Sequence, residues 1–155
     1  MRPELGPPFS PGWRGAPPGM LAPDVPAWWG FLARYDLGIQ VIHYNVRVGQ
    51  GTPVPSGADD FMRDQLNALT RERVDAVGRA PLVTYLIEVN ADAGVRSIGQ
   101  AILYRQMWLE DPPPGWPPAV AAIVTVVLRN DIIAVAAANN IALYPVGPDD
   151  VPRMV

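Results

Sequence analysis

The chain has 155 residues and a mass of 16.8 kDa, the size of one ordinary domain. Its composition is 49% hydrophobic and 17% charged, which excludes a disordered acidic or basic chain. Cysteine is absent and His43 is the one histidine, so zinc–cysteine sites, thiol nucleophiles and multi-histidine metal sites are excluded. All 12 basic residues are arginines and the net charge is −3, which removes lysine chemistry and any general attraction to nucleic acid.

The first 26 residues predict an extended arm, because prolines and glycines recur throughout them. Prolines at this density interrupt helices and sheet ladders, so we expect the arm to form neither. The arm has no apolar segment of the kind that follows the basic start of a secretory signal. It does carry Trp13, Met20 and Leu21, which are candidate contacts with another protein.

The next segment, residues 27–147, predicts a single α/β domain, followed by a C-terminal tail over residues 148–155. In chain order, apolar spacing predicts a helix from Trp28, a strand over 39–48, a helix over 59–71, strands over 73–77 and 82–90, a helix over 95–109, a strand over 120–128, a helix over 131–139 and a strand over 141–146. The two strands 73–77 and 82–90 are separated by a short turn and are expected to form an antiparallel hairpin. The longest apolar run is far shorter than the roughly 20 residues of a membrane span.

Two acidic residues interrupt the strands of this hairpin. Asp75 lies between Val74 and Ala76, and Glu88 lies between Ile87 and Val89. An uncompensated charge in an apolar strand is costly, and a divalent cation would compensate both charges at once. Carboxylate oxygens suit Mg²⁺ or Mn²⁺, which could activate water for phosphodiester cleavage.

The sequence resembles the PD-(D/E)XK nuclease-like superfamily, in particular its small phage-encoded members. The matching pieces are Tyr44-Asn45-Val46-Arg47-Val48-Gly49, Arg73-Val74-Asp75-Ala76-Val77-Gly78, Ile87-Glu88-Val89-Asn90 and Ile98-Gly99-Gln100-Ala101-Ile102-Leu103-Tyr104. The resemblance covers roughly residues 28–146 and implies a central mixed sheet flanked by helices. It further implies that Asp75 and Glu88 are metal ligands that converge at one end of the sheet, with Gln100 facing them.

The chain departs from the family pattern at Asn90, where the third active-site residue is usually lysine. Asparagine can orient water or phosphate by hydrogen bonds but supplies no positive charge. Arg96 and Arg105 are the candidates for a replacement cation. The catalytic set, active or vestigial, is thus Asp75, Glu88, Asn90 and Gln100.

Each of these residues also has a purely structural interpretation. Asp75 could form an ion pair with Arg71, Arg73 or Arg105, and Glu88 could be satisfied by a hydrogen bond to Gln100 or Tyr104. His43 alternates with Val41 and Asn45 along its strand and is assigned no role.

These observations support two functional hypotheses. The first, which follows from Asn90 and from the arm, is a phage virion component built on a degenerate nuclease-like domain without a cofactor. In this hypothesis the arm docks on other phage structural proteins, and the protein forms a homo-oligomer or part of a larger assembly. It is located in the virion and, during assembly, in the host cytoplasm. The alternative is a DNA nuclease in which Asp75 and Glu88 bind Mg²⁺ or Mn²⁺.

Overall fold

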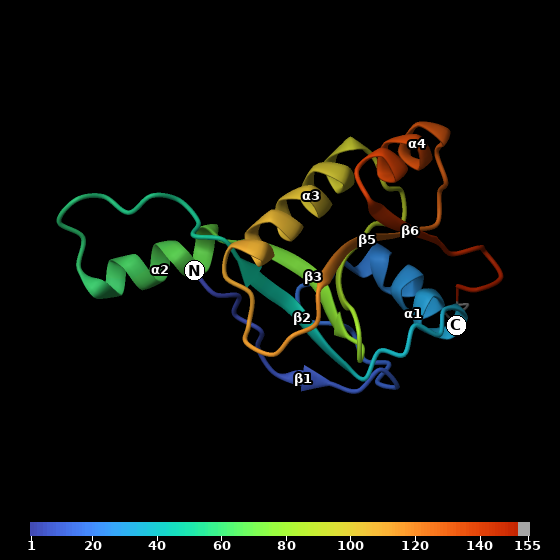
Figure 1. The fold of residues 1–155 in the computed structure, drawn as a ribbon, viewed down its shortest axis with the longest axis horizontal. Helices are drawn as coiled ribbons and strands as arrows, with labels where there is room; N and C mark the ends of the chain where they lie inside the picture. Colours follow the sequence, from blue (N-terminus) through green and yellow to red (C-terminus); the bar gives the residue numbers. More distant parts are fainter. Residues whose placement is uncertain (152–155) are drawn as a thin grey trace.

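A computed structural model describes residues 1–151 and shows a six-stranded mixed sheet with helices on both faces (Figure 1). The elements are β1 (Pro8–Phe9), the 3₁₀ turn η1 (Ala22–Asp24), α1 (Val25–Arg34), β2 (Val41–Val48), α2 (Asp60–Thr70), β3 (Glu72–Arg79), β4 (Thr84–Val89), α3 (Val95–Glu110), β5 (Ala119–Thr125), α4 (Asn130–Ala138) and β6 (Ile141–Pro145). The α/β class and the mixed, helix-flanked sheet predicted from the sequence are confirmed. No helix within residues 1–151 is long and apolar enough to cross a membrane.

The strands follow one another across the sheet in chain order, from β1 to β6. The first four are antiparallel neighbours, and β4, β5 and β6 run parallel. The expected hairpin is therefore present as β3 and β4. Parallel neighbours need a crossover connection, and α3 and α4 supply the two that are required.

The sheet separates two apolar layers. On one face, Trp28 and Phe31 of α1 pack on Ile87 of β4 and Val124 of β5. On the other face, Tyr104 and Trp108 of α3 pack on a second group of strand residues, Val46, Val48, Val74, Val77 and Leu86. Glu88 follows Leu86 at the two-residue spacing of a strand, so its side chain lies on the α3 face.

The middle of β2 changes which residues face each layer. Asn45 has a left-handed backbone conformation, with φ of 53°. Before it, Ile42 and Tyr44 belong to the α1 layer, whereas Val46 and Val48 after it belong to the α3 layer. Asparagine is among the few residues besides glycine that adopt this conformation readily.

The N-terminal arm lies on the body of the domain, and the expectation that it forms neither helix nor sheet ladder is wrong. Its last residues form the η1 turn and the start of α1 at Val25. Pro8 and Phe9 pair with His43 and Ile42 at the edge of the sheet. Proline is tolerated on an edge strand, where its missing N–H faces away from the ladder. His43 contributes to this attachment, because its Nδ1 lies 3.1 Å from the Gly6 carbonyl oxygen.

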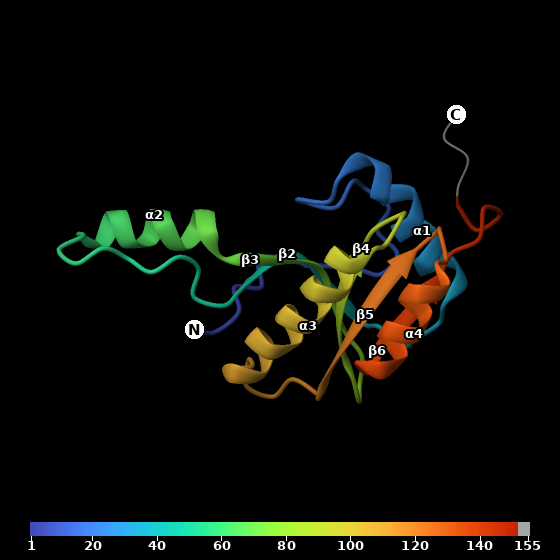
Figure 2. The same ribbon diagram turned by 90° about the horizontal axis from the view of Figure 1, so that it is seen from above.

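The segment between β2 and β3 projects away from the rest of the molecule (Figures 1 and 2). It contains α2, which begins at an Asp59 cap whose side chain accepts a hydrogen bond from the Met62 N–H. None of the α2 residues is buried. The sequence predicts this helix correctly, but its apolar residues do not join the core.

Candidate active site

The candidate site forms where β3 and β4 separate. Their ladder ends at the pair Ala76 and Ile87, and the next positions in the same register are Asp75 and Glu88. Beyond this point Asp75 replaces the missing backbone partner, since its Oδ2 accepts a hydrogen bond of 2.8 Å from the Val89 N–H. The sequence of the hairpin thus brings the two carboxyl groups side by side.

Glu88 is the more deeply buried of the two acids. It is 5% exposed, and its Oε2 accepts a hydrogen bond of 3.2 Å from the hydroxyl of Tyr104 on α3. Burial, together with the neighbouring negative charges of Glu88 and Asp75, raises the pKa of Tyr104 above its usual range, so this hydroxyl is a neutral donor. Of the two hydrogen bonds considered for Glu88 from the sequence, the one to Tyr104 is present.

The two carboxyl groups lie close enough to influence each other's ionisation. Burial, reinforced by the charge of Asp75, raises the pKa of Glu88 to about 8. Burial raises the pKa of Asp75 to about 6, although the hydrogen bond from Val89 opposes this rise. Without a cation, burial and the charge of Asp75 therefore disfavour ionisation of both carboxyl groups at once near neutral pH.

The pair opens into a cavity of about 220 Å³ between the arm, β3, β4 and α3. The residues that line it, besides the two acids, are Leu21, Asp24, Arg73, Val89, Asn90, Arg96, Gln100 and Tyr104. The cavity thus receives Gln100 from α3, as the resemblance implies. Three of the four residues in the sequence-derived catalytic set lie on β3, β4 or directly after β4, and the fourth lies on α3.

Asn90 lines the cavity while both ends of its amide have partners in the chain. Its Nδ2 donates to Ser97 Oγ at 3.3 Å, and its Oδ1 accepts a hydrogen bond of 3.1 Å from the Asp92 N–H. These bonds fix the turn between β4 and α3. Asn90 therefore has a structural role at the edge of the cavity.

Of the two candidate cations, only Arg96 lies at the cavity. Arg105 donates to the backbone carbonyls of Asn139 and Asn140 and is not part of the lining. Arg96, at the start of α3, forms no ion pair with any acid in residues 1–151. Its guanidinium is therefore available to a ligand in the cavity.

The ion pairs considered for Asp75 are not formed. The Arg71 side chain is used elsewhere, donating to the carbonyls of Gly49 and Arg2 and lying 3.7 Å from Glu4. Arg73 lines the cavity, but its guanidinium donates to the Ala68 carbonyl. Asp75 is left with a backbone N–H and a second acid as its partners.

Sequence reasoning missed a third carboxylate, Asp24, which the η1 turn places beside the pair. Its Oδ1 accepts a hydrogen bond of 3.0 Å from the Ala91 N–H, and its charge contributes to the raised pKa of both Asp75 and Glu88. An acid just before a helix start is an ordinary capping signal. No local pattern distinguishes it from a site residue, because its position depends on how the arm packs.

The three arm residues expected to contact a partner have different surroundings. Trp13 packs on Phe9 and Tyr44, with ring centroids 4.6 and 5.9 Å away, and Met20 packs against the α1 layer of the core. Leu21 is 71% exposed at the rim of the cavity. The structure thus places Trp13 and Met20 against their own chain.

The donor set suits a hard divalent cation that retains water. Asp75 and Glu88 offer carboxylate oxygens, and two protein carboxylates are sufficient for Mg²⁺ when water and substrate phosphate complete its shell. Among residues 1–151, no group of three or more histidine, cysteine, aspartate or glutamate side chains is close enough to hold a metal ion. The cation would therefore depend on these two acids and on the ligand itself.

Comparisons with protein-family models, curated proteins and solved structures gave no match.

Proposed function

We propose that this domain is a divalent-cation-dependent nuclease whose site is built on Asp75 and Glu88. The observation that carries the proposal is the pairing of these two acids at the end of the β3–β4 ladder, in a cavity that also receives Arg96. Two adjacent acids in a largely buried position oppose each other's ionisation, so a cation of charge 2+ would relieve an unfavourable arrangement. Perturbed acids in a cavity are typical of functional sites.

The proposed reaction is hydrolysis of a phosphodiester bond. Water adds to phosphorus, the bond from phosphorus to the leaving oxygen breaks, and that oxygen takes up a proton, giving a phosphate monoester and a free hydroxyl group. A cation held by Asp75 and Glu88 would supply Lewis acidity to the phosphate and lower the pKa of water.

The chain's own residues supply positioning and charge. Tyr104 holds Glu88 through its hydroxyl, and Val89 holds Asp75 through its N–H. Arg96 can form charge-assisted hydrogen bonds with phosphate oxygens, which compensates for the uncharged Asn90. Gln100 can donate a further hydrogen bond to phosphate or water.

The test is cleavage of linear and circular DNA by purified protein with Mg²⁺ or Mn²⁺. We expect cleavage by the natural sequence, loss in Glu88→Gln, and no change in Glu110→Gln, a matched control on an exposed acid at the far end of α3. Activity that persists in Glu88→Gln or without any divalent cation would contradict the proposal.

A second candidate is a degenerate domain that serves as an assembly component of a phage particle. The observation that favours it is that both ends of the Asn90 amide are hydrogen-bonded within the chain. A nuclease of the resembled type would have a cationic side chain at this position, facing the cavity. This candidate expects no cleavage by the natural protein. Recovery of metal-dependent cleavage in Asn90→Lys would then show that the remaining geometry is intact.

A further inference from the structure

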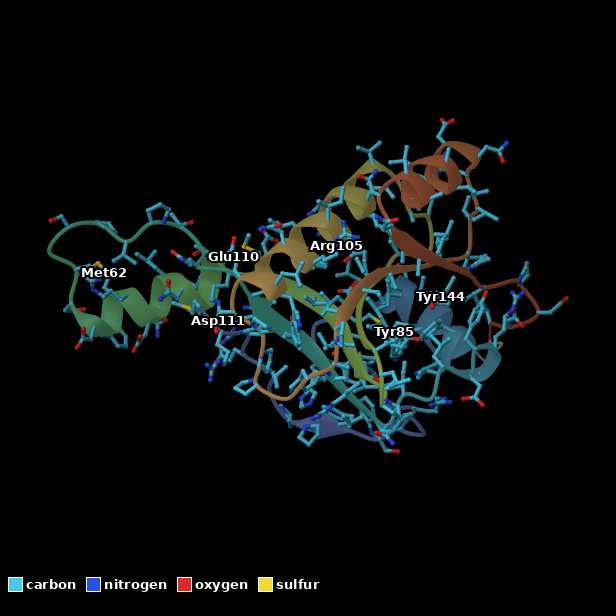
Figure 3. The ribbon with its side chains drawn as sticks, viewed as in Figure 1. Met62, Tyr85, Arg105, Glu110, Asp111 and Tyr144 are labelled. Atoms are coloured by element: carbon cyan, nitrogen blue, oxygen red, sulfur yellow. The ribbon has the colours of Figure 1, made fainter. Side chains whose placement is uncertain are left out.

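The projecting helix α2 has an uncovered apolar face. Phe61 is 73% exposed, Leu69 is 74% exposed and Met62 is 49% exposed, although all three lie in one helix of 11 residues. Figure 3 shows Met62 on this projection, well away from the sheet. An isolated helix shorter than about 12 residues is marginal in water, and helices in proteins gain most of their stability from packing of an apolar face.

The charge of α2 argues against nucleic acid as its partner. The cap and the N-terminal half of α2 carry Asp59, Asp60 and Asp64 against one arginine, Arg63. A polyanion would be repelled from this end of the projection. An apolar surface with positive charge near one end would complement this face of α2.

The outer face of α4 has these properties. From Ile133 to Ala138 the helix carries no charged side chain, and Ile133 and Val135 are each 41% exposed. Near its C-terminal end, Arg105 of α3 donates to the carbonyls of Asn139 and Asn140. Figure 3 labels Arg105 on α3, on the part of the molecule that adjoins α4.

The two faces cannot meet within one chain. The projection that carries α2 and the helix α4 lie toward opposite ends of the long axis of the molecule, in both views (Figures 1 and 2). The exposed side chains Phe61 and Leu69 of α2 are bulky, whereas α4 exposes the small side chains Ala134, Ala137 and Ala138. Large residues on one helix can therefore pack between small residues on the other. In an antiparallel arrangement, the acidic start of α2 lies next to Arg105.

We propose that the occupant is a second copy of this chain, with α2 of one molecule packed on α4 of the next. Such a contact joins two different surfaces, so each copy keeps one free α2 and one free α4. Repetition of a contact of this kind produces a ring or an open filament rather than a closed dimer. We expect one pair of short helices to bury less than the roughly 1,200 Å² of a stable interface, and we therefore expect assembly to depend on protein concentration.

The first test is sedimentation of the complete chain over a wide concentration range. We expect species larger than a dimer at high concentration, and their loss in Leu69→Asp on α2 and in Ala134→Asp on α4. Both positions are exposed. An equimolar mixture of the two variants restores one contact, so it forms a dimer and nothing larger.

Two outcomes would overturn the proposal. A natural protein that stays monomeric at every concentration contradicts self-association, and an assembly that is insensitive to Ala134→Asp while Leu69→Asp disrupts it indicates pairing between two α2 helices. Neither residue lines the cavity, so DNA cleavage is expected to be unchanged in both variants. Failure of this proposal is thereby distinguishable from failure of the proposed nuclease.

A crosslinking experiment avoids reliance on disruptive variants. Because the natural chain has no cysteine, oxidation of a mixture of Leu69→Cys and Ala134→Cys proteins should give a covalent dimer containing one of each. A matched control replaces Ala134→Cys with Leu82→Cys, at a position that is 82% exposed on the β3–β4 turn. Equal yields in the two mixtures would contradict a specific contact.

Discussion

The cavity between β3 and β4 and the projecting helix α2 depart from ordinary folding rules in opposite ways. The cavity places Asp75 and Glu88 in apolar surroundings, where ionisation of both is unfavourable. The projection exposes Phe61 and Leu69 to water, where no packing is gained. Both of the proposed sites, one for a cation and phosphate and one for a second copy of the chain, are thus identified by unfavourable contacts rather than by favourable ones.

The largest effect is expected from the acid pair. Glu88→Gln keeps the size of the side chain but removes its charge, and Asp75→Asn does the same on β3. We expect each to reduce metal-dependent DNA cleavage by at least about 10³-fold, because the cation loses one of its two protein ligands. Initial cleavage rates at saturating Mn²⁺ measure this effect. A reduction below ten-fold in both variants would contradict a shared cation.

Replacement of Arg96 is expected to have the next largest effect, because Arg96 lines the cavity and, within residues 1–151, its side chain forms no ion pair or hydrogen bond. Arg96→Gln should slow cleavage by about 10²-fold, since one positioned electrostatic group typically contributes 10² to 10³ in rate. The affinity of the Arg96→Gln variant for Mn²⁺ should equal that of the natural protein, because Arg96 does not bind the cation. Arg63→Gln on α2 is the matched control and should cleave at the natural rate. Equal cleavage rates for the two variants would contradict a contribution of Arg96 to cleavage.

The acid pair should also set the pH dependence of stability in the protein without metal. The pKa of Glu88 rises from 4.5 to about 8 on folding, so the folded state binds more protons than the unfolded state between these values. Stability is therefore expected to fall as pH rises through this range. Thermal melts in EDTA from pH 4.5 to 8.5 measure the trend, and Glu88→Gln should flatten it. A natural protein that gains stability toward pH 8 relative to Glu88→Gln would contradict the raised pKa.

The smallest effects are expected on stability, where a packed residue of the arm, Trp13, is compared with an exposed residue of α2, Leu69. Trp13→Ala should lower the free energy of unfolding by about 1–3 kcal/mol, because Trp13 packs on Phe9 and Tyr44. Leu69→Ala on α2 should change it by less than about 0.5 kcal/mol at a concentration where the protein is monomeric. Urea denaturation measures both. Equal, negligible effects would indicate that the arm is not part of the folded body.

The part of the site that could be predicted from sequence is the part built by neighbouring strands. Alternation of apolar residues identifies β3 and β4 as neighbouring strands, and the resemblance implies that Asp75 and Glu88 converge at one end of the sheet. Gln100 and Tyr104 are four residues apart and therefore share one face of α3. These relationships are local, and the sequence contains them directly.

The remainder depends on contacts between distant segments. The position of Asp24 follows from the arm crossing the body, which prolines and glycines alone did not indicate. Whether Arg96 or Arg105 reaches the cavity depends on which part of α3 faces the cavity and which part faces α4. For α2, periodicity predicts an apolar stripe but does not say what covers it. The sequence therefore predicts the pair of acids, but not the groups that surround them.

The central claim is that Asp75 and Glu88 share one divalent cation, and a crystal structure of the protein soaked in Mn²⁺ tests it most directly. Anomalous scattering identifies the ion without ambiguity. The account predicts a peak within about 2.0–2.6 Å of a carboxylate oxygen from each residue, with water or phosphate completing the shell. A cavity without a Mn²⁺ peak at saturating Mn²⁺ would contradict it.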